Sequence, residues 1–202
     1  MREAREPRTI RVDAGGVRLH GLEWGETGEA GESGEEPLVL LPGLGQSAHV
    51  YRMLAPALAT DRRVVALTPR AHGGSATPPS GYTVAHLAGD VRDAIDALGI
   101  TRATVVAHSA SGAVATRLAA DEPMRVGRLV YLDGIYDYAG RAQMVTRNPF
   151  PPPPRPVFGR PAENRAWLRR YALAGFWCEA LEADLAARRP AGEEADRLER
   201  LR

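Results

Sequence analysis

The chain has 202 residues, and its 26 lysines and arginines nearly balance its 25 aspartates and glutamates, for a net charge of +1. The arginines are spread among carboxylates and form no basic run interleaved with aromatics, which excludes the usual kind of nucleic-acid-binding protein. The single cysteine, Cys178, excludes an internal disulfide. Residues 1–8 lack the apolar stretch of a secretory signal, and no later run is apolar enough to cross a bilayer. We therefore expect a cytoplasmic protein that does not bind membranes.

The chain begins with two predicted strands. Residues 9–13 and 17–24 alternate apolar and polar side chains around Gly15-Gly16, which is the pattern of a β-hairpin. Residues 25–36 are rich in glycine and glutamate and hold almost no apolar side chains. Because such a segment has nothing to bury, we expect a solvated loop there.

Strand-like and helix-like segments then alternate. The strands are short apolar runs, and the helices repeat apolar residues every three or four positions. In chain order the prediction is strand 38–41, helix 47–59, strand 63–67, helix 84–98, strand 103–107, helix 110–121 and strand 126–132. This order predicts an α/β fold built on a doubly wound, mostly parallel sheet. Functional sites in such sheets lie beyond the carboxyl ends of the strands.

The character of the chain changes after this alternation. Residues 148–156 are rich in proline and predict an extended connector, and residues 162–189 have helical periodicity. We therefore divide the chain into a core of the first six strands, residues 1–139, and a connector with a helical cap-like segment, residues 140–202.

One segment has the pattern of a catalytic serine. Residues 105–112 run from a buried strand into a helix and have the form small-x-Ser-x-small, with Ala107 and Ser111 on either side of Ser109. A tight strand-to-helix turn projects such a serine above the sheet and requires small residues at both positions. The helix that follows directs its N–H groups to the same spot, so the N–H of Ala110 is a candidate oxyanion donor. A helix N-cap is the alternative role for Ser109.

Three further segments follow strands of the same predicted sheet. They are residues 41–45 (LPGLG), 69–75 (PRAHGGS) and 129–137 (LVYLDGIYD). Together with residues 105–112, they resemble the α/β-hydrolase superfamily, in particular its esterase-like members with an inserted helical cap. The resemblance covers roughly residues 9–139. Family members usually have glycine at one or both of the small positions beside the serine, where this chain has alanine and serine.

The resemblance implies a serine hydrolase that cleaves an ester or similar acyl bond of a small molecule, with no cofactor and no metal. Ser109 would be the nucleophile, and the backbone N–H groups of Leu44 and Ala110 would form the oxyanion hole. The strand order of the family is 1-2-4-3-5-6-7-8. Asp133 ends the sixth strand, where some branches of the family place the acid of the triad. A loop aspartate that binds backbone N–H groups is its alternative role.

None of the five histidines is an evident base for Ser109. His108 is its neighbour in a strand and so points to the opposite face. His72 follows a neighbouring strand, where it is either a surface residue or lies at the rim of the site. The other three lie in a predicted strand and two helices, without the spacing of metal ligands: His20, His49 and His86.

No histidine follows residue 108, and the last two strands and late histidine of the family are not in these 202 residues. The competing hypothesis is therefore a catalytically inactive member, truncated or a pseudoenzyme, that binds a small molecule. A chain that continues past Arg202, or a second polypeptide that supplies the strands, are further alternatives. Without those strands, strand 126–132 would have a neighbour on one side only, so we expect self-association through this sheet edge.

Overall fold

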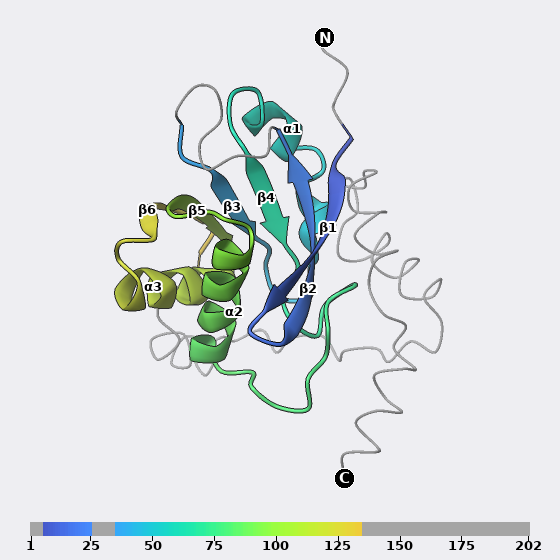
Figure 1. The fold of residues 1–202 in the computed structure, drawn as a ribbon, viewed down its shortest axis with the longest axis vertical. Helices are drawn as coiled ribbons and strands as arrows, with labels where there is room; N and C mark the ends of the chain where they lie inside the picture. The colour runs from blue at the N-terminus through green and yellow to red at the C-terminus, as the bar shows by residue number, and fades with distance from the viewer. Residues whose placement is uncertain (1–5, 26–34, 135–202) are drawn as a thin grey trace, which may run out of the picture.

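The computed structural model describes residues 6–25 and 35–134. Their centre is a six-stranded sheet in the order β1-β2-β4-β3-β5-β6 (Figure 1). The six strands are β1 (Arg8–Ala14), β2 (Val17–Trp24), β3 (Leu38–Leu41), β4 (Val64–Leu67), β5 (Ala103–His108) and β6 (Val126–Leu132). This order confirms the prediction for the first six strands, and the α/β fold class with it.

The sheet joins an antiparallel hairpin to a parallel unit. β1 pairs with β2 and β2 with β4 in antiparallel register, whereas β4, β3, β5 and β6 run parallel. In the central register Leu40 lies opposite Ala66 on one side and Val106 on the other. The loops that follow these parallel strands therefore leave the sheet at one common edge.

Helices cover both faces of the sheet, as the doubly wound prediction requires. Helices α2 (Val84–Ala97) and α3 (Ser111–Asp121) lie side by side on one face (Figure 1). The other face is covered by a 3-10 helix, η1 (Ala48–Tyr51), and the short helix α1 (Ala55–Leu58). Each parallel strand divides its side chains between the two apolar clusters, since Val39 packs toward α2 and α3 and Leu40 toward η1. The central strands are therefore buried throughout.

The predicted continuous helix 47–59 is wrong. The chain forms η1 and α1 instead, separated by residues 52–54. Pro56 lies in the first turn of α1, and a proline there has no N–H to bond the preceding turn. The apolar spacing showed the buried face correctly, but the proline divides the segment. The other helices differ from prediction by one residue at an end.

Several predictions fall outside the described residues. They are the boundary at residues 139/140, the connector 148–156, the helical segment 162–189 and Cys178 within it. In the two ranges that the structure describes, no helix has the length and apolarity to cross a bilayer.

A buried ion pair ties the loop after β4 to helix α2. Both carboxylate oxygens of Asp90 accept hydrogen bonds from the Arg70 guanidinium, each at 2.6 Å. The same guanidinium donates to the carbonyl of Gly81 at 2.6 Å and lies over the ring of Tyr82. The bonds to Asp90 raise the pKa of Arg70 above its ordinary value. Because both ends are satisfied by several hydrogen bonds, the pair fixes the loop and the helix in one arrangement.

Asp90→Asn should therefore destabilise the fold by about 3 kcal/mol, because it leaves the Arg70 charge buried without its counter-charge. The matched control is Asp121→Asn, which removes an exposed partner of Arg117 and should cost less than about 1 kcal/mol. Urea unfolding of the two variants measures the difference. Equal losses of stability would contradict the role given to the buried pair.

A stacked pair of histidines joins the hairpin to η1. The rings of His20 in β2 and His49 in η1 lie 5.6 Å apart and nearly parallel, at 15°. The Thr68 hydroxyl lies 3.2 Å from Nδ1 of His20 and accepts the Ala48 N–H at 3.0 Å. Burial lowers the pKa of His20, and the nearby charges of His49 and Arg11 lower it further. The folded state therefore favours the neutral imidazole of His20.

Acid should weaken the fold through this pair. Above pH 6.5, the ordinary pKa of histidine, His20 is neutral in both the folded and the unfolded chain, so it causes no loss of stability. As the pH falls below that value the unfolded chain takes up the proton first, so unfolding becomes more favourable. The urea midpoint should therefore fall more steeply between pH 7.5 and 5.5 in the wild type than in His20→Gln. His86→Gln, at an exposed histidine, should retain the wild-type slope.

The edge strand β6 carries exposed apolar side chains. Among the described residues it pairs with β5 alone, and Val130 and Tyr131 are 40% and 37% exposed. We propose that the 202-residue chain self-associates through this edge, because unpaired strand edges recruit other strands. Sedimentation should show oligomers at tens of micromolar that Val130→Lys weakens. Met124→Lys, at an exposed residue outside the strand, is the control. A stable wild-type monomer would refute the proposal.

Candidate functional site

Ser109 occupies the turn between β5 and α3 with a left-handed backbone, φ 52°. Its N–H donates to the carbonyl of Leu132 at 3.0 Å, and its carbonyl accepts the N–H of Gly112 at 3.0 Å. The N-cap position of α3 belongs to Ala110, so Ser109 does not cap the helix. A positive φ is costly for a residue with a side chain. The tight strand-to-helix turn that the sequence predicts at Ser109 thus has a strained backbone.

The loop after β3 lies directly against this turn. A Cβ atom built on Gly43 would lie 3.2 Å from the Cβ of Ser109, closer than ordinary van der Waals contact, so the lack of a side chain at Gly43 lets the loop lie against the Ser109 turn. Ser111 is buried, and its hydroxyl donates to the carbonyl of Pro42 at 2.5 Å. At the end of β3, the hydroxyl of the buried Tyr51 donates to the carbonyl of Leu41 at 2.8 Å, and burial raises the pKa of this phenol. Helix α3 and the loop after β3 are therefore joined where the two strands end.

Gln46 fixes the loop after β3 from within. Its side-chain oxygen accepts the N–H of Gly43 at 2.9 Å. The same oxygen lies 3.0 Å from Nδ1 of His108, which must be the protonated ring nitrogen because an amide oxygen only accepts. His108 therefore has a structural role beside Ser109, as its strand position predicts.

His72 lies at the rim of the site, the second of the two roles that the sequence left open. It is half-buried, and its Nε2 accepts the N–H of Gly45 at 3.0 Å. Its Nδ1 lies 2.9 Å from the carbonyl of Arg70. His72 thus connects the loop after β4 to the loop after β3.

The remaining predicted site residues lie around the same edge. Leu44 lies between Gly43 and Gly45, and its side chain is 77% exposed. Asp133 follows Leu132, whose carbonyl binds the N–H of Ser109, and its side chain is exposed. The structure brings Asp133 close to the serine turn along the backbone, and its role as triad acid stays a prediction.

Backbone strain is concentrated at this edge. Among the described residues, three residues other than glycine have positive φ: Ala71 at 63°, Ser109 at 52° and Asp133 at 46°. They follow β4, β5 and β6 at the carboxyl ends of the strands. Strain of this kind costs roughly 1–3 kcal/mol per residue and is found mostly at functional sites. This edge is therefore the candidate active site.

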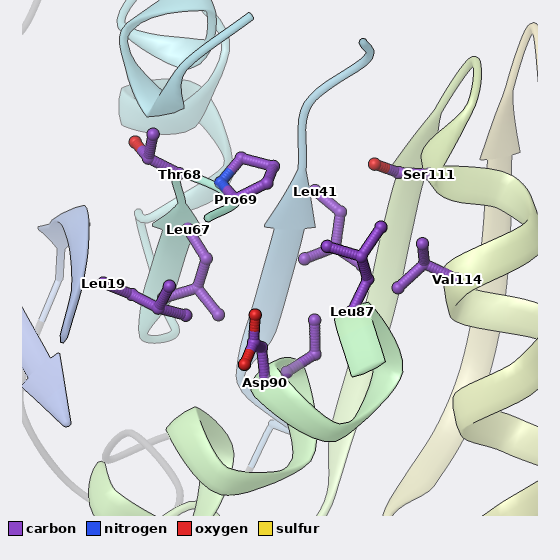
Figure 2. Close-up of a pocket in the computed structure, with 10 residues that line it drawn as sticks. Leu19, Leu41, Leu67, Thr68, Pro69, Leu87, Asp90, Ser111 and Val114 are labelled. Atoms are coloured by element: carbon purple, nitrogen blue, oxygen red, sulfur yellow. The ribbon is translucent and has the colours of Figure 1, made fainter. Parts of the chain in front are cut away.

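A small apolar cavity of about 50 Å³ lies between the sheet and helices α2 and α3 (Figure 2). Ser111 and Asp90 supply polar groups to its wall, and Ser109 is not part of the lining. The other lining residues are Leu19, Leu41, Leu67, Thr68, Pro69, Leu87, Val91 and Val114. Ser111 belongs both to the wall of this cavity and to the contact between α3 and the loop after β3.

Among the described residues, which include all five histidines, no histidine forms a hydrogen bond to the Ser109 side chain. His72 and His108 hold loop atoms, His20 and His49 stack on each other, and His86 lies 2.7 Å from the hydroxyl of Thr83. Within the described ranges, no three His, Cys, Asp or Glu side chains lie together in the manner of a metal site.

Sequence reasoning missed two of the residues that shape this site. Nothing in the pattern identified Gln46, and Ser111 was expected only as a small residue that fits the turn. Their partners lie 62 and 69 residues away along the chain, so no local spacing reveals them. The one available signal was that each is a polar residue beside a glycine, Gly45 for Gln46 and Gly112 for Ser111.

Comparison with known proteins agrees with this architecture. A profile of the alpha/beta hydrolase fold matches residues 36–175. The chain is 40% identical over 101 residues to the protein provisionally named carbamate hydrolase RutD from Caulobacter segnis, a match that covers 49% of this chain and 38% of the relative. It is 39% identical over 99 residues to a soluble epoxide hydrolase from a Corynebacterium species, covering 49% and 35%.

A solved structure extends the match over most of the chain. The epoxide hydrolase CorEH superposes with a TM-score of 0.66 at 26% identity, covering 90% of this chain and 66% of CorEH. The matches to the two curated relatives take in less than two fifths of their lengths. The profile, by contrast, covers more than half of the present chain. The chain therefore belongs to the alpha/beta hydrolase fold family.

Proposed function

We propose that this hydrolase-family protein is a serine hydrolase that cleaves an ester or related acyl bond of a small molecule. The observation that carries the proposal is the strained turn at Ser109, which lies in contact with the loop after β3. A serine held in this way presents its hydroxyl at the carboxyl edge of the sheet, where a substrate can reach it.

The proposed chemistry is acyl transfer in two steps. The Ser109 hydroxyl attacks the carbonyl carbon, a base removes its proton, and the leaving alcohol departs from an acyl-enzyme that water then hydrolyses. The N–H groups of Leu44 and Ala110 stabilise the negative oxygen of each tetrahedral intermediate. Asp133 is the candidate for the acid that orients the base.

A serine favours acyl substrates over the epoxides named in some relatives. Attack by its hydroxyl on an epoxide carbon would leave an ether on the enzyme, and water does not readily cleave an ether. Attack on an ester or a carbamate leaves an acyl-serine, which water can cleave. The chemistry of Ser109 therefore supports acyl substrates, of which the carbamate in the name of RutD is one.

The base is the open element of the mechanism. Four of the five histidines contact groups other than Ser109, and the fifth, His49, stacks on His20. Among the residues that the structure describes, the proposal therefore has no assigned base. The competing function is a non-catalytic protein that binds a small molecule at the same edge, and it is favoured by this lack of a base.

On the composition of the chain, we also propose a cytoplasmic location.

A fluorophosphonate probe separates the two functions. We expect slow labelling of Ser109 in the 202-residue chain, because a serine hydroxyl without a base is a poor nucleophile. Imidazole in the buffer should raise the rate about tenfold or more by acting as the base, and Ser109→Ala should abolish labelling. Labelling that imidazole does not accelerate would favour the binding protein. Rapid labelling without imidazole, lost in Ser109→Ala, would reveal a base within the chain.

A further inference from the structure

Two glycine N–H groups of the loop after β3 are held by side chains, one from the same loop and one from the loop after β4. Gly43 donates to the oxygen of Gln46 at 2.9 Å, and Gly45 donates to Nε2 of His72 at 3.0 Å. Leu44 lies between them, and among the described residues none accepts its N–H. Three successive N–H groups are thus divided into two that bind protein and one that is available to a ligand.

The hydrogen-bond partners of His72 determine which of its ring nitrogens carries a proton. A backbone N–H only donates, so Nε2 of His72 must carry no proton. A carbonyl only accepts, so the Nδ1 that faces the Arg70 carbonyl at 2.9 Å must carry one. His72 is therefore held as one neutral tautomer with both ring nitrogens engaged, and it cannot take a proton from Ser109 without releasing Gly45.

The hydrogen bonds of the Gln46 side chain are determined in the same way. Its side-chain oxygen accepts from Gly43 and from Nδ1 of His108. The oxygen therefore couples the loop to the last residue of β5, immediately before Ser109.

We propose that His72 and Gln46 are positioning residues that hold Gly43 and Gly45 so that the N–H of Leu44 faces the oxygen of a substrate bound at Ser109. This inference rests on the proposed function and deepens it. A Gly-Leu-Gly segment has wide backbone freedom, and an oxyanion hole stabilises charge only when its donors are already aligned. The two side chains remove that freedom at the residues on either side of the donor.

Amide exchange tests the positioning without any turnover. In the 202-residue chain, the amide proton of Gly45, followed by NMR, should exchange about tenfold faster in His72→Ala than in the wild type. His72→Gln, which restores an acceptor, should recover the slow rate, and Gln46→Ala should accelerate Gly43 instead. His86→Ala is the matched control and should change neither. The amide of Val106 in the core reports whether each variant is folded. An unchanged Gly45 rate in a folded His72→Ala would overturn the proposal.

Acylation tests the effect on the reaction. With imidazole and p-nitrophenyl acetate, His72→Ala should lower the limiting rate of Ser109 acylation about 10- to 100-fold and leave the half-saturating ester concentration nearly unchanged. His72→Gln should recover most of the rate. A Gly45 amide released by His72→Ala with no loss of acylation would overturn the positioning role. Absence of acylation in the wild type would defeat the proposed function alone, and faster Gly45 exchange in His72→Ala would still support the role of His72 in holding the loop.

Discussion

The candidate site depends on the buried ion pair between Arg70 and Asp90. Asp90 belongs to a long helix packed on the sheet, so it provides a rigid point to which the loop after β4 is attached. The carbonyl of Arg70 then orients His72, and His72 in turn holds Gly45. Two charges so deeply buried are tolerated because each is met by directional hydrogen bonds. The ion pair thereby attaches a loop without regular structure to helix α2.

Parallel pairing explains why so few residues suffice to build the site. The strands β3, β4, β5 and β6 all end at one edge, so the loops after them meet without any long connection. Neighbouring loops are then linked by side chains. Ser111 and Gln46 join the loop after β3 to the end of β5 and the start of α3, and His72 joins it to the loop after β4. The site therefore consists of loops at one edge of the sheet that are held together by hydrogen bonds from side chains.

Much of this architecture could be predicted from the sequence, because it follows from periodic patterns. Buried runs such as residues 38–41 identify strands, and the alternation of elements leads to a parallel sheet with Ser109 on a strand-to-helix turn. The break at Pro56 was missed because the apolar periodicity continues across it. The roles of His72 and Gln46 were missed for a different reason, since they depend on contacts between loops, which only the folded chain defines. Sequence periodicity predicts which face is buried, and it carries no information on such contacts.

In the loop after β3, the constraint on the backbone and the freedom of the side chain fall on neighbouring residues. A side chain at Gly43 would displace its neighbours, because a Cβ atom there would lie 2.9 Å from both Gln46 and His108 and 3.2 Å from Ser109. Leu44 is 77% exposed, and only its backbone N–H takes part in the proposed site. The residue at position 44 can therefore be exchanged for almost any other without altering the backbone geometry. Natural variation or directed evolution can therefore change the side chain at position 44, and with it the entrance of the proposed site, while the backbone that we propose as the oxyanion donor stays the same.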